Sequence, residues 1–330
     1  MTSTSTWSRR TFLGALAAAP VAAAIPTGAW ASTTPVTSSD PILGFVLDRR
    51  RIKRIDLPGN GDQTVLAGIS NTGRIVGKTP SVDAVGFDGL VGDVRGFRRV
   101  AFPGARATYA TKVNQRGQIV GAANRRAPTV GSPGTFGYLV DRGRFTRIAV
   151  SDAVYTQAHG LNNRGQVVGE FLDEAGVFHG FRWERGRFTT FDGPLGGSTS
   201  ITDINDRGVM VGLYIAEDGT GRGFQLRGDT YTTFGAFGLP VTLPWDINNL
   251  GQVAGSSFDL VAEGHGFLFA DGIDQPVTQI DVPGASATNV FGLDDRGRLL
   301  GIYVNPNAGG RAVPAGLPRP PLGLTARVLQ

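Results

Sequence analysis

Short apolar runs of about four to six residues alternate with glycine-rich polar turns through most of this chain. In one stretch, ITDIN and VMVGLY flank a DRG turn, and RGFQL and YTTF flank RGDT. Runs of this length, bounded by Gly, Asn and Asp, are typical of β-strands joined by tight turns. The pattern predicts an all-β fold built from four-stranded antiparallel meanders.

One unit of sequence recurs six times along the chain. Its turn motif reads ISNTGRIVG (69–77), VNQRGQIVG (113–121), LNNRGQVVG (161–169), INDRGVMVG (204–212), INNLGQVAG (247–255) and LDDRGRLLG (293–301). A Gly–aromatic element recurs between these motifs, with its glycine at Gly44, Gly86, Gly137, Gly180, Gly223 and Gly266. These glycines are 42, 51, 43, 43 and 43 residues apart, and the long interval includes an insertion within 122–135. A four-stranded unit repeated at about 40–45 residues predicts the blades of a β-propeller.

The two ends of the repeat region hold incomplete units. LGFVLDRRRIKRID (43–56) corresponds to the third and fourth strands of a unit, and VFGLDDRGRLLGIYV (290–304) to the first and second. We therefore expect a six-bladed propeller over residues 42–304, closed by a blade that takes two strands from each terminus. Residues 32–41 are predicted to be a linker, and 305–330 a Pro-, Gly- and Arg-rich tail, because neither segment contains a copy of the repeat.

Two positions within each unit carry predictions about local structure. The residue that opens the turn is Ser70, Asn114, Asn162, Asn205, Asn248 or Asp294, and we expect its side chain to cap its own turn. A ring of carboxamide ligands is the alternative interpretation. The glycine that ends each motif is expected to allow close backbone approach, and the aromatic residue of each Gly–aromatic pair to fill the space between neighbouring blades.

The first 31 residues have the features of an export signal. Arg9 and Arg10, followed by Phe12 and Leu13, resemble the twin-arginine signature, and an alanine-rich apolar stretch leads to a small-residue cleavage site after Ala31. A membrane anchor is the alternative, but the stretch is shorter than the ~20 apolar residues that a spanning helix needs. The resemblance implies a protein that is exported folded to the cell exterior, with the twin-arginine machinery and signal peptidase as its partners.

The repeat itself resembles the HAF extracellular repeat family, whose members are exported bacterial proteins built from G-F and IN-x-x-G-x-[IV]-V-G units. The resemblance covers residues 43–304 in six copies. It brings no established catalytic residues, so none is carried over to this chain.

Composition narrows the possible chemistry. The 330 residues include 49 glycines and no cysteine, which excludes disulfides, thiolate metal sites and cysteine nucleophiles. Loss of the first 31 residues removes two arginines and no acid, so the formal charge falls from +5 to +3. Basic runs such as RRRIKR (49–54) could contact anionic polymers, but we interpret them as a solvated strand-and-turn face and expect no nucleic-acid partner.

One position breaks the repeat in a chemically suggestive way. It lies two residues before the turn Asn on the predicted innermost strand, and its residues are Gly68, Lys112, Gly160, Asp203, Asp246 and Gly292. Asp203 and Asp246 belong to adjacent blades, so their carboxylates could converge near the central channel and serve in acid–base chemistry or cation binding. The alternative is local: each carboxylate caps a neighbouring backbone group. In a pure scaffold the carboxylates are dispensable, and Asp→Asn at both positions should be neutral or mildly stabilising, because it relieves like-charge repulsion.

The three histidines give weaker signals. His179 and His265 precede the Gly–aromatic pair in two non-adjacent blades. They could form a metal site, or they could be ordinary strand residues. His159 begins an inner strand, and no Ser–His–Asp set is visible around it. We name Asp203, Asp246, Lys112 and His159 as candidate binding residues, and we assign no catalytic residue. No P-loop, nucleophile elbow or dinucleotide motif occurs.

The sequence favours a secreted, monomeric, non-catalytic binding or scaffold module whose polysaccharide or protein ligand docks on a propeller face. The alternative is an extracellular hydrolase or lyase with a carboxylate-lined or cation-bearing channel. Near-uniform repeats favour the first, because an active site would break the repeat at several clustered positions. No cofactor is predicted, and a divalent cation in the channel stays open. A stable membrane anchor is not expected, since LPRPP (317–321) lacks the features of a wall-sorting signal.

Overall fold

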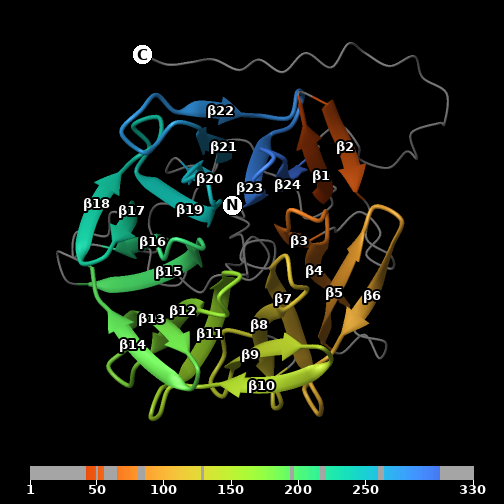
Figure 1. Cartoon of the computed structure of the whole chain (residues 1–330), viewed down its shortest axis with the longest axis vertical. Coiled ribbons are helices and arrows are strands. Elements are labelled where there is room, and N and C mark those ends of the chain that lie inside the picture. Colours follow the sequence, from red (N-terminus) through yellow and green to blue (C-terminus); the bar gives the residue numbers. More distant parts are fainter. Residues whose placement is uncertain are drawn as a thin grey trace, which may run out of the picture.

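The structure is a computed structural model that describes residues 42–49, 51–55, 65–80, 86–127, 130–193, 197–215, 221–258 and 264–304. The regular secondary structure in these ranges consists of strands, and Figure 1 shows their sheets arranged around a common centre. The prediction of an all-β fold is confirmed. Within the described ranges, no helix is long and apolar enough to cross a membrane. The signal segment 1–31, the linker 32–41 and the tail 305–330 lie outside the described residues.

The strands are short and follow one another closely along the chain. The first twelve are β1 (Ile42–Asp48), β2 (Arg51–Ile55), β3 (Val65–Ile69), β4 (Ile75–Pro80), β5 (Phe87–Asp93), β6 (Gly96–Val100), β7 (Ala107–Val113), β8 (Ile119–Asn124), β9 (Phe136–Asp141), β10 (Arg144–Ile148), β11 (Tyr155–Leu161) and β12 (Val167–Leu172). The remainder are β13 (Phe178–Glu184), β14 (Arg187–Phe191), β15 (Ser198–Ile204), β16 (Met210–Ile215), β17 (Gly221–Arg227), β18 (Thr230–Phe234), β19 (Val241–Ile247), β20 (Val253–Phe258), β21 (Gly264–Phe269), β22 (Thr278–Ile280), β23 (Ala287–Leu293) and β24 (Leu299–Val304).

Antiparallel pairing between consecutive strands groups them in fours. The units are β3–β6, β7–β10, β11–β14, β15–β18 and β19–β22. Single parallel bridges, Phe87 to Ala107 and Gly221 to Val241, join two pairs of neighbouring units. The four-stranded antiparallel meander that the sequence predicts is therefore the building unit of the molecule.

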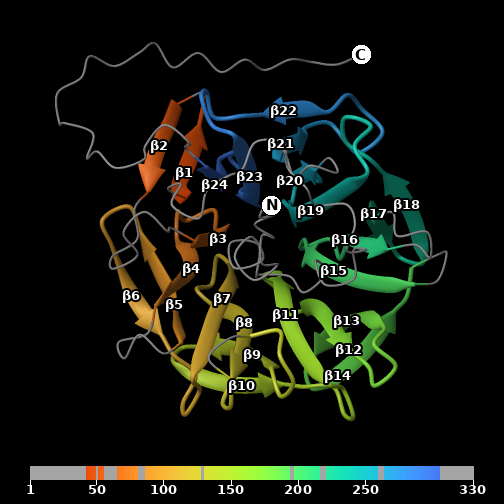
Figure 2. The ribbon, with the colours of Figure 1, turned by 180° about the vertical axis from the view of Figure 1, so that it is seen from behind.

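A further sheet combines both ends of the described region. Its strand order is β2-β1-β24-β23, and β1 runs antiparallel to β24 with Phe45 opposite Gly301. The views in Figures 1 and 2 agree that these strands, from opposite ends of the colour scale, lie side by side. The pairing leaves two strands from the first half-unit and two from the last in one sheet.

The apolar core lies mainly between neighbouring units. One cluster packs Phe45 of β1 against Ile280 and Val290, and another packs Ile148 of β10 against Phe181 of β13. Five of the six aromatic residues of the Gly–aromatic pairs are fully buried there, namely Phe45, Tyr138, Phe181, Phe224 and Phe267, whereas Phe87 is half-buried. Burying a side chain of this size stabilises the fold by roughly 1.5–3 kcal/mol. The expectation that these residues fill the space between units is confirmed for these five.

The register corrects one assignment of the repeat. The sequence places the Gly–aromatic pair of the β3–β6 unit at Gly86 and Phe87, but the structure places Gly89 and Leu90 at the equivalent positions. Leu90 pairs with Gly77, as the aromatic residue of the other units pairs with the glycine that ends their turn motif. Leu90 is buried, so an aliphatic side chain fills the space that an aromatic ring fills elsewhere. The Gly86–Phe87 pair matched the Gly–aromatic pattern, so the sequence alone did not indicate Gly89 and Leu90.

The glycine that ends each turn motif is required by crowding. A Cβ on Gly121 would overlap the carbonyl oxygen of Tyr109, and one on Gly212 would overlap that of Ser200. The equivalent glycines of the other units meet a backbone carbonyl in the same way. The predicted close approach of the backbones is confirmed.

Candidate functional site

A bulge on each innermost strand determines where the repeat-breaking residues lie. The pairing register shifts between Leu66 and Gly68, Ala110 and Lys112, Ala158 and Gly160, Ile201 and Asp203, Pro244 and Asp246, and Val290 and Gly292. The extra residue bends the strand and re-aims the side chain that follows it. Where no side chain fits, the residue is glycine: a Cβ on Gly160 would lie 2.6 Å from the Cα of Asp203.

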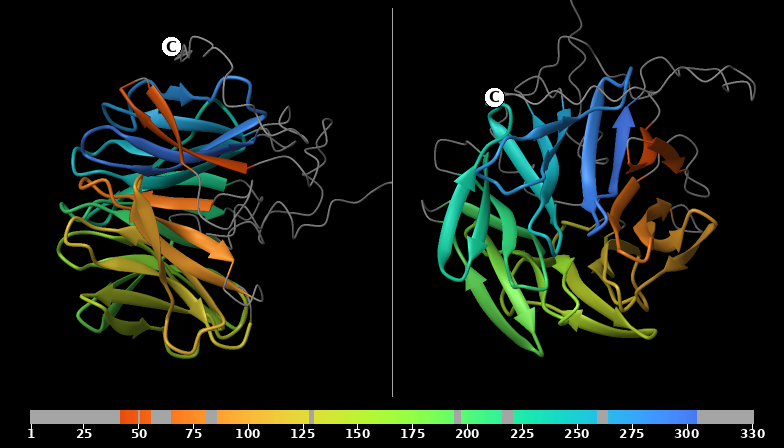
Figure 3. Two further views of the ribbon diagram at one scale, coloured as in Figure 1. Left: turned by 90° about the vertical axis from the view of Figure 1, so that its right-hand side faces the viewer. Right: turned by 45° about the horizontal axis from the view of Figure 1, so that its top comes forward.

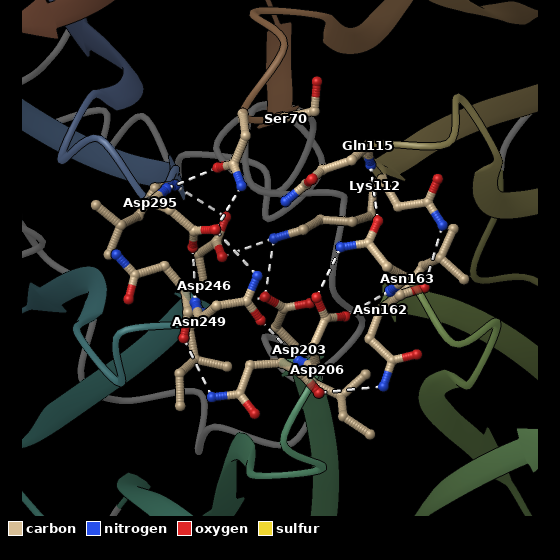
Figure 4. Close-up of a pocket in the computed structure, with 18 of the residues that line it drawn as sticks. Ser70, Lys112, Gln115, Asn162, Asn163, Asp203, Asp206, Asp246, Asn249 and Asp295 are labelled. Carbon is tan, nitrogen blue, oxygen red and sulfur yellow. Dashed lines mark hydrogen bonds and ion pairs between the residues drawn. The ribbon is translucent and has the colours of Figure 1, made fainter.

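Three of these side chains meet at the centre of the molecule. The Nζ atom of Lys112 lies 2.8 Å from Oδ2 of Asp203 and 2.6 Å from Oδ1 of Asp246. Both carboxylates are 1% exposed and the lysine side chain is 13% exposed. Figure 4 shows them converging from three different units. The structure thus brings together three of the four candidate binding residues.

Each carboxylate also joins its own unit to the next one. Asp203 Oδ2 accepts the backbone N–H of Ile247 at 3.1 Å, and Asp246 Oδ2 accepts that of Leu293 at 2.9 Å. Each carboxylate does cap a backbone N–H group, as the local alternative supposed, but that group belongs to the next unit. Because Lys112 already offsets the like-charge repulsion, the expectation that Asp→Asn would be neutral or stabilising loses its physical basis.

Burial and charge both act on the pKa values of Lys112 and Asp246. Burial alone would lower the pKa of Lys112, but the carboxylates of Asp203 and Asp246 outweigh that effect and raise it. Burial raises the pKa of Asp246 well above its usual value; the Lys112 ammonium opposes this rise, and the Asp203 carboxylate adds to it. The Oδ1 atom of Asp203 is buried and has no hydrogen-bond partner among the described residues.

A polar pocket lies against this trio at one end of the central axis. It encloses about 380 Å³ of empty space, part of it open to solvent, and its lining includes residues from all six turn motifs. Besides Asp203 and Asp246, the carboxylates of Asp206 and Asp295 line it, and Lys112 is the lysine among them. The lining therefore carries an excess of negative charge and many amide groups.

The turn residues that surround the pocket are hydrogen-bonded within their turns and across units. Asn114 Oδ1 accepts the backbone N–H groups of Arg116 and Gln118, each at 3.0 Å, which confirms the predicted capping of its own turn. Its Nδ2 donates to the carbonyl of Asn162 in the next unit at 3.1 Å. Asn162, Asn205 and Asn248 donate to the following unit in the same manner. The carboxamides serve as links between units.

A second set of links uses the residue after the turn Asn. The backbone N–H of Asn163 donates to Asp206 at 2.7 Å, and that of Asp295 donates to Asn71 at 2.7 Å. Equivalent bonds run from Gln115 to Asn163, from Asp206 to Asn249 and from Asn249 to Asp295. Every residue at this position has a carboxylate or carboxamide side chain. This regularity is visible in the sequence and could have predicted the contacts between units, but the sequence analysis did not use it.

His159, the fourth candidate, lies elsewhere. Its Nε2 is 3.7 Å from Oε2 of Glu170 on β12, and it does not line the pocket. Glu170 is fully buried. Burial and the Glu170 carboxylate raise the pKa of the nearby Tyr155 phenol. Sequence analysis missed Glu170 because its repeat position varies freely, with Lys78, Ala122, Leu213, Ser256 and Ile302 in the other units, so a glutamate does not stand out there.

The other two histidines pair with aspartates at the surface and do not meet. His179 Nδ1 lies 2.7 Å from Asp192, and its Nε2 lies 3.3 Å from Asp173. His265 Nδ1 lies 3.0 Å from Asp281. Partial burial lowers the pKa of His179, but its bonds to Asp192 and Asp173 outweigh this and raise it. In the described part of the chain, no group of three His, Asp or Glu side chains is arranged to hold a metal ion.

Comparison with solved structures defines the fold class. The structure is similar to a putative TolB from Agrobacterium tumefaciens, with a TM-score of 0.59, 11% identity, and coverage of 81% of this chain and 99% of the other. It is also matched to the β-propeller domain of the trilobed protease of Pyrococcus furiosus (TM-score 0.49, 13% identity, 83% and 89% covered). A lectin of Aleuria aurantia in complex with Fucα1-6GlcNAc is matched with a TM-score of 0.43, 12% identity, and 76% and 97% covered.

The chain therefore has an all-β architecture of the β-propeller type. At these identities the likeness concerns the fold alone. No protein-family model matches the chain. A comparison with curated proteins finds no match either.

Proposed function

We propose that this chain is an exported, non-catalytic binding module that takes a polar ligand, such as a segment of a polysaccharide or a protein, in the pocket at the centre of the propeller. The observation that carries the proposal is the lining of the pocket, where the partly exposed carboxylates of Asp206 and Asp295 lie among the carboxamides of several turns. Carboxylates and carboxamides of this kind accept and donate hydrogen bonds to the hydroxyl and amide groups of a polar ligand.

The rigidity of the trio favours binding over catalysis. A general acid or base must exchange its proton with the substrate during the reaction. Lys112 is held by two carboxylates, and each carboxylate is held by a backbone N–H of the next unit. Groups that hold the fold together in this way can orient a ligand, whereas movement of a proton among them would loosen the centre of the molecule.

The architecture that we propose is a ring of six blades, closed by the sheet β2-β1-β24-β23. It is supported by the pairing of β1 with β24 and by the bond from Asp295 to Asn71, which links the last turn to the first. We also propose membership of the HAF extracellular repeat family, from the six turn motifs. Such a ring would place all six turns around one pocket.

Export by the twin-arginine route is proposed from Arg9 and Arg10. Replacement of both arginines by lysine should stop secretion, because the receptor reads the guanidinium pair. Immunodetection of the protein in the medium is the measurement. Undiminished secretion of the double variant would contradict this route.

An extracellular hydrolase or lyase is the second candidate. The raised pKa of Asp246, next to the Asp203 carboxylate, is the feature that a general acid requires and favours this alternative. Calcium would be a further sign of it, since divalent cations prefer carboxylate oxygens. We expect no calcium-induced rise in melting temperature, because the Lys112 ammonium occupies the space between the two carboxylates.

The test compares ligand binding in two variants of the protein that starts at Ser32. Gln115→Trp places a large side chain at the exposed rim of the pocket, and Val94→Trp does the same on an exposed turn outside it. Binding of neutral oligosaccharides and peptides is measured by calorimetry. We expect Gln115→Trp to weaken binding at least about tenfold and Val94→Trp to leave it unchanged. Equal affinity of both variants would contradict the pocket, and polysaccharide cleavage lost in Asp246→Asn would establish the enzyme instead.

A further inference from the structure

The outermost strands differ in charge from one half of the molecule to the other. The fourth position of these strands is Arg54, Arg99 and Arg147 in β2, β6 and β10, but Thr190, Thr233 and Gln279 in β14, β18 and β22. The third position is Lys53 and Arg98 in β2 and β6, and threonine in the other four. Most of these side chains are exposed. The same structural position therefore changes from basic to neutral.

The three basic strands are neighbours in space. Figure 1 shows β2, β6 and β10 following one another along one edge of the molecule, and the left panel of Figure 3 views that edge from the side. Arg51 and Arg144 occupy the first position of β2 and β10 and add two further exposed charges. We call this surface, made of Arg51, Lys53, Arg54, Arg98, Arg99, Arg144 and Arg147, the basic edge.

Protection of sheet edges does not account for the basic edge. Lysine and arginine on an edge strand prevent pairing with another molecule. That need is the same for β14, β18 and β22, which meet it mainly with threonine and glutamine, although β14 begins with the exposed Arg187. An additional function of the charges would explain why basic residues at the third and fourth positions are confined to three neighbouring units.

Intramolecular ion pairs leave much of the charge available. Arg99 contacts Asp88 at 2.6 Å, and Arg147 lies over the ring of Phe136. Lys53, Arg98 and Arg144 make no ion pair with the part of the chain that the structure describes. These three charges are in contact with solvent and face no acidic partner there.

The asymmetry extends through the sequence. Residues 42–148 contain 18 lysines and arginines against seven acidic residues, whereas residues 228–295 contain none against nine. One side of the ring is therefore strongly positive and another is negative. A field of this kind steers anionic partners toward the basic edge.

We propose that the basic edge binds a linear acidic polysaccharide. Guanidinium groups bind carboxylates and sulfates through paired hydrogen bonds, and charges repeated on three adjacent strands match charges repeated along a polymer. The exposed positions of β2, β6 and β10 carry no aromatic side chain on which nucleic-acid bases could stack, which favours a sugar polymer. The choice of an extracellular polymer rests on the proposed export, but the site is separate from the central pocket.

The test measures binding of polygalacturonate to the protein that starts at Ser32. The variant Lys53→Thr, Arg98→Thr, Arg144→Thr installs the residue that β18 carries at the equivalent positions, so the fold should tolerate it. The matched control, Arg207→Thr, Arg222→Thr, Arg227→Thr, removes the same charge from exposed sites elsewhere. At about 0.1 M salt we expect at least about a tenfold loss in the first variant and less than about threefold in the control.

Three outcomes would overturn the proposal: no binding of polygalacturonate by the unaltered protein, an equal loss in both triple variants, or tighter binding of double-stranded DNA than of polygalacturonate. Circular dichroism and the melting temperature establish that both variants are folded. Gln115→Trp should bind polygalacturonate normally, so failure of the pocket and failure of the basic edge are distinguished. The reciprocal variant Thr190→Arg, Thr233→Arg extends the edge and should strengthen binding.

Discussion

At the scale of single residues, the centre of the molecule depends on a buried cation shared between two carboxylates. Removing one partner from such a group leaves uncompensated charge in a low-dielectric environment, which costs about 3–5 kcal/mol. The trio links three units, so its loss would act on all three. Its members are also those that break the repeat, which makes them conspicuous in the sequence.

We expect Lys112→Met to destabilise the protein by about 3 kcal/mol or more, because Asp203 and Asp246 would face each other without a cation. Urea denaturation followed by tryptophan fluorescence measures the change. Lys53→Met, on the exposed strand β2, is the control and should be neutral within about 0.5 kcal/mol. Similar stability of the two variants would show that the trio contributes nothing to the fold.

The pairing of His179 with two aspartates predicts a pH dependence of stability. Its pKa is raised in the folded state, so its contribution is fully present below the unfolded pKa of about 6.5 and is lost as the pH rises through the folded value. The free energy of unfolding should fall between pH 6 and pH 8 by more in the unaltered protein than in His179→Gln. Identical pH profiles of the two proteins would contradict this assignment.

At the scale of elements, a repeated threonine connects five of the inner strands, β7, β11, β15, β19 and β23, to the linker before each. Thr108, Thr156, Thr199, Thr242 and Thr288 each accept, through Oγ1, the backbone N–H of the residue six positions earlier. The threonine lies near the start of the strand and the bulge near its end. Together they hold the inner strand at the depth where its repeat-breaking side chain reaches the axis.

Thr199→Val keeps the shape of the side chain but leaves the N–H of Gly193 without its acceptor. We expect a loss of about 1–2 kcal/mol, the typical cost of leaving a buried donor unsatisfied. Thr189→Val on the exposed strand β14 is the matched control and should change stability little. Chemical denaturation of both variants provides the measurement, and equal values would contradict a structural role for the threonine.

At the scale of the whole molecule, the sheet β2-β1-β24-β23 joins the two ends of the repeat region. Phe45 and Leu47 of β1 pack in the same apolar cluster as Val290 of β23. Without β1, one long edge of β24 would lose its ladder of backbone hydrogen bonds. If the ring closes as proposed, the stability of every unit depends on this contact.

Deletion of residues 43–56 should therefore destabilise the entire protein, because it removes both β1 and β2 and exposes the edge of β24. We expect a fall in melting temperature of at least about 10 °C, or failure to fold. Deletion of residues 310–330, which hold no copy of the repeat, is the control and should leave melting unchanged. A protein without residues 43–56 that melts like the full chain would contradict the proposed closure.

Much of this architecture could be predicted from the sequence, because the same sequence unit recurs six times. A short apolar strand and a turn that needs glycine are local requirements, so six copies of one pattern determined the four-stranded units, the positive-φ turns and the crowded glycines such as Gly121. The sequence also showed that Lys112, Asp203 and Asp246 occupy the same position of the repeat unit, because residues that depart from the repeat are easily recognised.

The tertiary structure alone decided what those residues contact. The sequence could not show that Lys112 bridges two units that follow it at a distance, that Asp203 accepts an N–H from the next unit, or that Glu170 lies beside His159. Nor could it place Leu90 where an aromatic residue was expected. Contacts between units depend on the bulge, the twist of each sheet and the packing of one unit against the next. These are properties of the folded molecule, whereas the repeat reflects only the local requirements of each unit.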